Sequence, residues 1–375
     1  MRADKFLSVL EDMSGRFFTG VPDSLLMPLL DEIVDKYGVT DKHVVAANEG
    51  AAVGLAAGFY LATGRPGVVY MQNSGIGNAI NPICSLLHEK VYAIPVIFVI
   101  GWRGEPGVKD EPQHAFQGEI TLKLLELLEI PYVIISPQTD LEELESKLDA
   151  LRQHVSNKRS VAIVVRTGTL QSDKEIDHHT VAAISREEAL ETILDVSDDF
   201  ICVCSTGKLS REVFEIRERQ GFGHNHDFLT VGSMGHSISI ALGLAREKPD
   251  KRVLCLDGDG AALMHLGSLA TAGISELDNL VHIVLNNGAH ETVGGMPTAC
   301  SRLSLAETAE TLGYRRSISL MTTEDIMNVA DFIKSAKGPA FIEVICNTQS
   351  RGNLGRPTTT PADNKKQLME HLRES

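Results

Sequence analysis

Several features that mark whole classes of protein are missing from this 375-residue chain. No apolar run reaches the length of a membrane-spanning helix, and no N-terminal stretch resembles a signal peptide. Residues 1–7 are better explained as the start of an amphipathic helix. We therefore expect a cytoplasmic protein that does not insert into a membrane.

Cysteine is also scarce, and its spacing excludes two kinds of site. The six cysteines lie mostly in apolar, strand-like contexts, at positions 84, 202, 204, 255, 300 and 346. Cys202 and Cys204 would lie on one face of a strand, which matches neither a zinc knuckle nor a C-x-x-C redox pair. We expect reduced, buried thiols and no disulfide framework.

Positive charge is in deficit, with 35 Lys and Arg against 50 Asp and Glu and a formal net charge of −15. The summed field would repel nucleic acid and anionic membranes, so neither is an expected partner. An anionic small molecule remains a possible substrate if basic groups gather locally. The single Trp, the 32 glycines and the 43% apolar content are typical of an α/β protein, and the length suggests two domains.

Short apolar runs alternate with helix-like stretches, which predicts parallel sheets covered by helices on both faces. The expected strands are 44–47, 67–71, 96–100, 132–135, 162–166, 200–204, 227–231, 252–256, 282–285 and 341–345. The expected helices include 51–62, 117–128, 141–154, 208–220, 237–246, 264–272, 304–312 and 323–335. The predicted fold is α/β, with two doubly wound parallel-sheet domains over 1–166 and 191–350, a linker over 167–190 and a tail over 351–375.

Two motifs lie at the ends of predicted strands in the second half. The first is Leu254-Cys-Leu-Asp-Gly-Asp-Gly260 and the second is Val284-Leu-Asn-Asn287, with residues 261–285 between them. Ligands collect at this edge of an α/β sheet. Glycines let the backbone approach a phosphate, and Asp259 with an Asn amide offers oxygen ligands for Mg²⁺. Two tight turns would also place Asp and Asn here, which is the alternative explanation.

At this spacing the two motifs resemble the diphosphate and metal signature of the thiamine-diphosphate enzymes. The resemblance implies that the first half is a pyrimidine-binding domain and the second a diphosphate-binding domain, with no middle domain between them. It also implies thiamine diphosphate and Mg²⁺ as cofactors. In this family the two kinds of domain meet between chains, so we expect a homodimer or a higher homo-oligomer.

The resemblance also assigns residues of the second half. For the metal it implies the Asp259 and Asn287 side chains and the Ala289 carbonyl, whereas Asn286 is expected to brace the turn. Met234 is expected to wedge under the cofactor, and the Gly232 carbonyl to accept from its amino group; an ordinary core Met is the alternative. The residues expected to contact the diphosphate are Gly258, Asp259, Gly260 and Ala261, together with Ser205, Thr206 and Gly207.

Glu49 is the expected activator of the cofactor. It lies at a predicted strand-to-helix transition, at the head of a helix rich in Ala and Gly. Thiamine chemistry needs a carboxylate hydrogen-bonded to the pyrimidine, and a Glu in this context has that role in the family. A Glu placed at a helix N-terminus for the helix dipole alone is the alternative explanation.

Four longer segments resemble the phosphonopyruvate decarboxylases more narrowly. They are Gly20-Val-Pro-Asp-Ser24, the segments 72–78 and 101–118, and Asn286-Asn-Gly-Ala-His-Glu-Thr-Val-Gly-Gly295, and the match extends into 353–357. The implied reaction converts 3-phosphonopyruvate to phosphonoacetaldehyde and CO₂ in phosphonate metabolism. Sulfopyruvate decarboxylases are similar but commonly split the two halves into separate subunits, so fusion favours the phosphonate substrate. A non-catalytic cofactor-binding paralogue is a further alternative.

A doubly charged phosphonate beside a carboxylate needs cations or backbone donors gathered at one place. The basic candidates are Arg103, Lys109, Arg351 and Arg356, although each could be an ordinary surface charge. The other residues expected at the mouth of the site are Asp23, Ser24, Gln72, Asn73, Ser74 and Asn78. His114 and His290 are the expected proton carriers, with His236 and His265 as alternatives, and each could instead be a hydrogen-bonded loop histidine.

Overall fold

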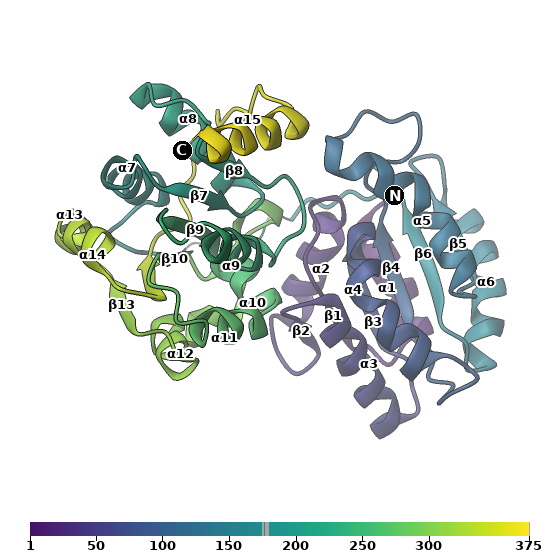
Figure 1. Ribbon diagram of the computed structural model, residues 1–375. Helices are drawn as coiled ribbons and strands as arrows, with labels where there is room; N and C mark the ends of the chain where they lie inside the picture. Colours follow the sequence, from purple (N-terminus) through teal and green to yellow (C-terminus); the bar gives the residue numbers. More distant parts are fainter. Residues whose placement is uncertain (175, 177–179, 375) are drawn as a thin grey trace. The chain divides into compact units, whose positions relative to one another are not determined.

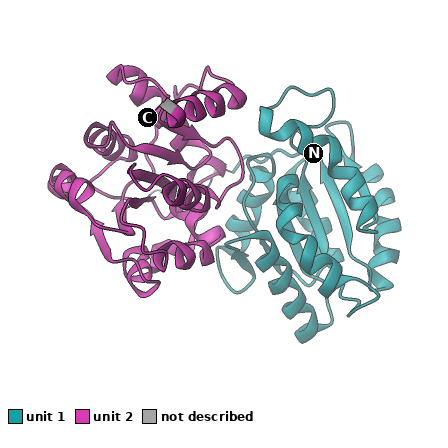
Figure 2. Cartoon of the chain, viewed as in Figure 1, with its two compact units in different colours: residues 1–177 teal, residues 178–375 magenta. Residues whose placement is uncertain are grey.

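Each half of the chain builds its own six-stranded parallel sheet (Figure 1). The computed structural model describes residues 1–174, 176 and 180–374. It divides into unit 1, Met1–Asp177, and unit 2, His178–Ser375 (Figure 2). The described residues form no third unit, so the predicted pair of α/β domains without a middle domain is confirmed.

Unit 1 alternates strands with helices along the chain. Its elements are α1 (Ala3–Met13), β1 (Phe18–Gly20), α2 (Met27–Tyr37), β2 (His43–Val45), α3 (Glu49–Thr63), β3 (Val68–Gln72), α4 (Ile76–Pro82), β4 (Ile97–Gly101), α5 (Pro112–Leu127), β5 (Tyr132–Ile135), α6 (Leu141–Ser156) and β6 (Val161–Val165). The strand order is β2-β1-β3-β4-β6-β5, and every pairing is parallel. Side chains of α3, α4 and α5 pack on one face of the sheet, and both faces of its central strands are buried.

Unit 2 repeats this architecture. Its elements are α7 (Arg186–Val196), β7 (Ile201–Cys204), α8 (Lys208–Gln220), β8 (Asp227–Leu229), α9 (Ser237–Glu247), β9 (Val253–Gly258), α10 (Asp259–Met264), α11 (Gly267–Gly273), β10 (Leu280–Asn286), β11 (Ala289–His290), β12 (Met296–Pro297), α12 (Leu305–Thr311), β13 (Arg316–Leu320), α13 (Thr323–Met327), α14 (Val329–Ser335), β14 (Ala340–Ile345) and α15 (Pro361–Glu374). The main sheet has the order β13-β14-β10-β9-β7-β8, again all parallel. β11 and β12 form a separate antiparallel pair.

Two apolar cores enclose the second sheet. Residues of α7, α8, α13 and α14 cover one face, and residues of α9, α11, α12 and α15 cover the other. Cys202 and Cys204 lie in the first core, whereas Ile201 and Val203 lie in the second, so both thiols occupy one face as predicted. All six cysteines are free, and only Cys84 is exposed.

The C-terminal segment is part of unit 2. In α15, the Asn364 amide accepts from the Leu229 backbone N–H at 3.0 Å and donates to the Asp227 carbonyl at 2.8 Å. These groups belong to β8, the edge strand, so the helix satisfies backbone groups that an edge would leave open. No helix in the described ranges has the length and apolar character needed to cross a bilayer.

Sequence patterns missed the main-sheet strands β1 and β13 and the short strands β11 and β12. They also missed α7, which begins inside the predicted linker, joined α13 and α14 into one helix, and misplaced the helix at 264–272. β1 has only three residues, too few to show a period, and β13 is an edge strand in which Arg and Ser alternate with apolar residues. The predicted helix over 264–272 is instead two helices. The first, α10, begins at Asp259 and ends before His265, whose backbone (φ −131°, ψ 55°) leaves the helical region.

A buried charged cluster connects α8 to β8. Asp227 lies 3.5 Å from Arg217 Nε and 3.4 Å from His224 Nδ1, and His224 Nε2 lies 2.8 Å from Glu218 Oε1. The His224 ring also stacks on Phe214 at 4.1 Å. Burial lowers the pKa of His224, but Asp227 and Glu218 outweigh this effect and raise the pKa above its ordinary value.

We predict that His224 stabilises unit 2 in a pH-dependent way. Because its folded pKa is raised, this contribution is fully present below the unfolded pKa of about 6.5 and is lost as pH rises through the folded pKa. The difference in unfolding free energy between wild type and His224→Gln should therefore shrink from about pH 6 to pH 8. Urea titrations at each pH measure it. His226→Gln is the control because that ring packs on His371 rather than between carboxylates, and an equal slope in both variants would contradict the assignment.

Candidate active site

Some of the candidate site residues follow the strands at which each sheet reverses its order. In unit 1 the reversal lies between β1 and β3, and in unit 2 it lies between β7 and β9. Open α/β sheets bind ligands in the crevice outside the carboxyl ends of such strands. The segments that leave these ends carry Asp23 and Asn73 in unit 1, and Ser205 and Asp259 in unit 2.

Asp23 is wholly buried beside the end of β3. Its Oδ1 accepts from Gln72 Nε2 at 3.0 Å, and Gln72 Oε1 accepts from Ser74 Oγ at 2.8 Å. A Cβ on Gly101 would lie 2.1 Å from Asp23 Oδ2, so only glycine fits there. Burial raises the pKa of Asp23 even though Gln72 and the charge of Arg103 oppose it. Asp23 is therefore a carboxyl group that can hold a proton more readily than a surface aspartate.

Arg103 lies in the same network and is already paired. Its guanidinium donates to both carboxylate oxygens of Asp110, at 2.8 and 2.5 Å, and to Ser24 Oγ at 3.3 Å. Asn73 fixes the Arg103 backbone by accepting from its N–H at 3.1 Å and donating to its carbonyl at 2.8 Å. The structure thus brings together five of the residues predicted to contact substrate: Asp23, Ser24, Asn73, Ser74 and Arg103.

The start of α5 packs closely against the loop that carries Arg103. A Cβ on Gly104 would lie 1.9 Å from the His114 carbonyl, and one on Gly118 would lie 1.7 Å from the Gly104 carbonyl. Burial and the nearby Arg103 lower the pKa of His114. The His114 imidazole is therefore neutral at pH 7 and can accept a proton.

Glu49 heads α3, as the sequence predicts. Asn48 caps the helix by accepting from the Ala51 N–H at 2.8 Å. The Glu49 carboxylate is 5% exposed and accepts from Asn78 Nδ2 at 2.7 Å. A Cβ on Gly75 would lie 2.4 Å from Glu49 Oε1, so the turn after β3 packs directly on the carboxylate. Burial raises the pKa of Glu49 against the Asn78 hydrogen bond, which suits a group that shares a proton with a ligand.

Asp259 starts α10 at the carboxyl end of β9 and is buried. Its carboxylate accepts a hydrogen bond from Thr298 Oγ1. Burial raises the pKa of Asp259 to about 6 against this hydrogen bond. A Cβ on the preceding Gly258 would meet nothing within 4 Å, so open space lies beside the turn.

The two asparagines after β10 have different roles. Asn286 accepts from the Gly288 N–H at 2.9 Å and donates to Glu343 at 2.7 Å, so the prediction that it braces the turn is confirmed. Asn287 Oδ1 accepts from the Ala289 N–H at 3.1 Å, and its Nδ2 donates to Glu291 at 3.0 Å. Both ends of the Asn287 amide thus bond within the segment 287–291 that carries the Ala289 carbonyl, whereas Asn286 also bonds to Glu343 on β14.

Met234 and His290 converge on the glycine after Asp259. A Cβ on Gly260 would lie 2.9 Å from His290 Cε1 and 3.5 Å from the Met234 methyl. Gly235 has φ +84°, and its own Cβ would meet His265 at 2.7 Å. Burial lowers the pKa of His290 to about 4, so this imidazole is neutral at pH 7. One ring nitrogen of a neutral imidazole donates a hydrogen bond, and the other accepts a hydrogen bond or a proton.

Three predicted basic residues lie on exposed surface. Lys109 is exposed in the loop before α5. Arg351 pairs with Glu187 at 2.8 Å and also with Glu215, and Arg356 is exposed in the same C-terminal segment. Of the basic candidates, only Arg103 joins the network at the sheet edge of its unit.

The residues present fit both cofactors. A buried carboxylate of raised pKa, Glu49, is the group that a protonatable pyrimidine nitrogen requires. Asp259, the Asn287 amide and the Ala289 carbonyl are hard oxygen donors of the kind that Mg²⁺ prefers. The glycine turn at Gly258 leaves backbone close to open space, as a diphosphate requires.

Sequence reasoning missed several residues that hold the site in place. They are Asp110 and Thr121 in unit 1, and Thr298, Glu291, Arg186 and Lys208 in unit 2. Asp110 and Glu291 lie inside segments that the resemblance covers, so their acidic character was a visible signal. Thr298 and Arg186 carried no signal, because only the folded chain brings them to Asp259 and Glu291.

Two family models match the chain. The N-terminal TPP-binding domain of thiamine pyrophosphate enzymes matches residues 2–127, and their C-terminal TPP-binding domain matches residues 205–344. The chain is 34% identical to a phosphonopyruvate decarboxylase from Streptomyces viridochromogenes, over 92% of this chain and 88% of that protein. It is 31% identical to one from Streptomyces hygroscopicus, over 99% of this chain and 94% of that protein.

A sulfopyruvate decarboxylase from Methanosarcina acetivorans is 28% identical, over 92% of this chain and 90% of that protein. That match spans both halves of this chain. The presence of both domains in one chain therefore does not distinguish the two kinds of decarboxylase, contrary to our expectation that fusion favours the phosphonate substrate. The chain belongs to the thiamine pyrophosphate enzymes, within the carboxy-lyase family of the phosphonopyruvate decarboxylases.

Proposed function

We propose that the protein decarboxylates 3-phosphonopyruvate to phosphonoacetaldehyde and CO₂, with thiamine diphosphate and Mg²⁺. The observation that carries the proposal is the placement of Asp23 and Asp259 at the two sheet reversals, in a chain that aligns with phosphonopyruvate decarboxylases over nearly its whole length. In the reaction the bond between the carboxylate and the keto carbon breaks, and one proton takes the place of the departing CO₂.

Bound thiamine diphosphate supplies the electron sink that decarboxylation of a 2-oxo acid requires. Glu49 holds the proton that the pyrimidine end exchanges, because burial has raised its proton affinity. Asp259, Asn287 and the Ala289 carbonyl hold Mg²⁺, and the glycine turns at 207 and 258–260 receive the diphosphate. Met234 supports the cofactor from the side of Gly260.

The substrate end of the site is assigned to the Asp23–Arg103 network. Arg103 contributes the positive charge, and the substrate anion is assigned to its Nη1 edge, which donates to the Ser24 hydroxyl at 3.3 Å. We assign the proton that enters the product to Asp23 or His114. Burial raises the pKa of Asp23 and lowers the pKa of His114, and both shifts suit a proton carrier. Neutral His290 is a hydrogen-bonding group on the cofactor side.

Sulfopyruvate is the second candidate substrate, favoured by the full-length match to a sulfopyruvate decarboxylase. Both acids carry a tetrahedral anion beside a 2-oxo acid, but the phosphonate can carry one more negative charge. We expect Arg103 to distinguish the two substrates by this difference in charge.

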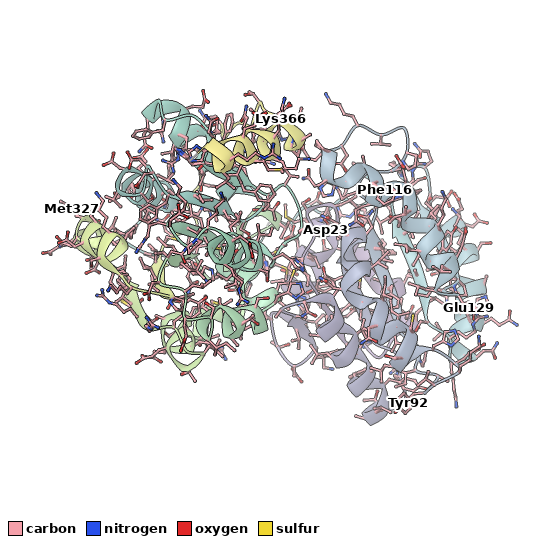
Figure 3. The ribbon with its side chains drawn as sticks, in the orientation of Figure 1. Asp23, Tyr92, Phe116, Glu129, Met327 and Lys366 are labelled. Atoms are coloured by element: carbon pink, nitrogen blue, oxygen red, sulfur yellow. The ribbon has the colours of Figure 1, made fainter. Side chains whose placement is uncertain are left out.

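A second copy of the chain is the proposed partner, with each active site built between chains. α3 is apolar all round, yet Gly54, Leu55, Gly58 and Leu61 are exposed along one side of it. Ile80 on the neighbouring α4 is 38% exposed, and Tyr92, labelled in Figure 3, is 67% exposed. Small side chains let a second identical helix approach closely, and contact with that helix would bury this apolar face away from water.

The first test is turnover of both acids by purified protein, with and without thiamine diphosphate and Mg²⁺. We expect decarboxylation only when both cofactors are present, and a kcat/KM for phosphonopyruvate at least about tenfold above that for sulfopyruvate, or ~1.4 kcal/mol. Coupled reduction of the aldehyde measures it. The reverse preference would establish the sulfonate enzyme, and metal-dependent cofactor binding without CO₂ release from either acid would establish a non-catalytic protein.

Glu49→Gln should bind cofactor but turn over about 10²–10⁴-fold more slowly, because the amide cannot exchange the proton. Isothermal titration calorimetry measures binding, and single-turnover CO₂ release measures chemistry. Asn78→Ala is the matched control, since it removes the hydrogen bond at 2.7 Å but keeps the carboxylate; its loss should be much smaller. Normal turnover by Glu49→Gln would remove Glu49 from the mechanism.

Leu55→Asp should dissociate the oligomer and weaken cofactor binding, because it places a charge in the proposed α3 interface. Light scattering coupled to size exclusion measures the mass. Leu127→Asp, at a more exposed leucine on α5 of the same unit, should leave the mass unchanged. A Leu55→Asp variant with wild-type mass would show that α3 does not form the interface.

A further inference from the structure

The Asn287 amide is held in one orientation from both of its ends. Its Nδ2 donates to Glu291 Oε2 at 3.0 Å, and its Oδ1 accepts from the Ala289 N–H at 3.1 Å. An ionised carboxylate only accepts, and a backbone N–H only donates. Turning the amide over would place two acceptors together at Glu291 and two donors together at Ala289, so the oxygen stays on the Ala289 side.

Glu291 is itself held by two cations from two helices. Arg186 Nη1 donates to Glu291 Oε2 at 2.6 Å, and Lys208 Nζ donates to Glu291 Oε1 at 3.1 Å. Arg186 and Lys208 are the first residues of α7 and α8. Arg186 also forms a two-point contact with Glu212, at 2.6 and 2.8 Å. The position of the Glu291 carboxylate is therefore fixed by elements that contain none of the proposed metal ligands.

The donors around Glu291 leave its oxygens as acceptors. Arg186 and Lys208 donate to one oxygen each, and Asn287 Nδ2 donates to the oxygen that Arg186 also contacts. The Glu291 side chain is only 10% exposed, so water competes little for its oxygens.

We propose, on the basis of the metal site in the proposed function, that Glu291 is a positioning residue that makes Asn287 present its oxygen, rather than its nitrogen, to Mg²⁺. Asp259 needs no such partner, because both terminal atoms of its carboxylate are oxygens. An asparagine ligand has one oxygen and one nitrogen of nearly the same shape, and the wrong orientation would place N–H groups toward a cation. Arg186 and Lys208 act one step further out, by placing the carboxylate.

Loss of an outer partner of this kind typically lowers metal affinity about 10–100-fold. A residue that merely stabilises the loop would lower affinity whatever ligand stands at position 287. A residue that orients an amide matters only while position 287 is an amide. Asp at 287 presents oxygen in either orientation, and beside Glu291 it would suffer repulsion between two carboxylates.

A double-mutant cycle between positions 287 and 291 tests the proposal. The readouts are Mn²⁺ affinity by electron paramagnetic resonance with saturating thiamine diphosphate, and thermal unfolding of the cofactor-free protein. We expect Glu291→Ala to weaken Mn²⁺ binding about 10–100-fold when position 287 is Asn. In the Asn287→Asp background the same change should leave the affinity unchanged or raise it, so the loss seen with Asn at position 287 disappears or reverses. Glu291→Gln gives an isosteric version of the cycle if the alanine variant unfolds.

Glu212→Gln is the matched control, because it removes the other carboxylate of Arg186 without touching Asn287. It should lower the unfolding temperature and leave Mn²⁺ affinity within about threefold of wild type. An equal loss of affinity from Glu291→Ala in both backgrounds, or an equal loss from Glu212→Gln, would overturn the positioning role. If wild type itself showed no metal-dependent cofactor binding, the proposed function would fail instead, and the two failures are distinguishable.

Discussion

The main-chain ladder between β7 and β9 ends at one hydrogen bond, from the Ser205 N–H to the Leu256 carbonyl at 2.8 Å. Beyond this hydrogen bond the segments that follow the two strands separate: the one after β7 enters α8, and the one after β9 enters α10. Parallel strands all end at the same edge of the sheet. Where the strand order reverses, the segments that follow two neighbouring strands diverge and leave a gap between them. The diphosphate-binding residues of unit 2 are those that stand on either side of this gap.

Unit 1 meets the same constraint with different side chains. The Asp23–Gln72 hydrogen bond joins the segment after β1 to the end of β3, and Arg103 lies in the segment that follows β4. This edge is filled by side chains that bond to one another rather than by open glycine turns. The difference fits the two tasks, since a diphosphate needs backbone and room, whereas a small anionic acid needs a fixed cation and a proton carrier.

Three buried carboxylates share an energetic feature. Burial raises the pKa of Glu49, Asp23 and Asp259, and each has few hydrogen-bond donors to offset the lost hydration. Isolated buried charges are costly unless they are paired. Arg186 illustrates the opposite case, because its guanidinium pairs with both Glu212 and Glu291. At Glu49, Asp23 and Asp259 a bound ligand would supply the missing partner.

The sequence alone determined the two-sheet α/β architecture, the positions of most strands and helices, and the chemical type of the residues that follow them. Alternating apolar runs and glycine-rich strand ends are local patterns, and the resemblance to thiamine-diphosphate enzymes singled out Glu49, Asp259 and Asn287 among the residues that follow them. The tertiary structure alone decided which distant groups hold those residues: Thr298 on Asp259, and Arg186 and Lys208 on Glu291. It also decided that Arg103 joins Ser24 whereas Arg351 pairs with surface carboxylates. These partnerships join segments far apart in the chain, and strand order and helix packing, which no local pattern encodes, determine which of the many possible partners meet.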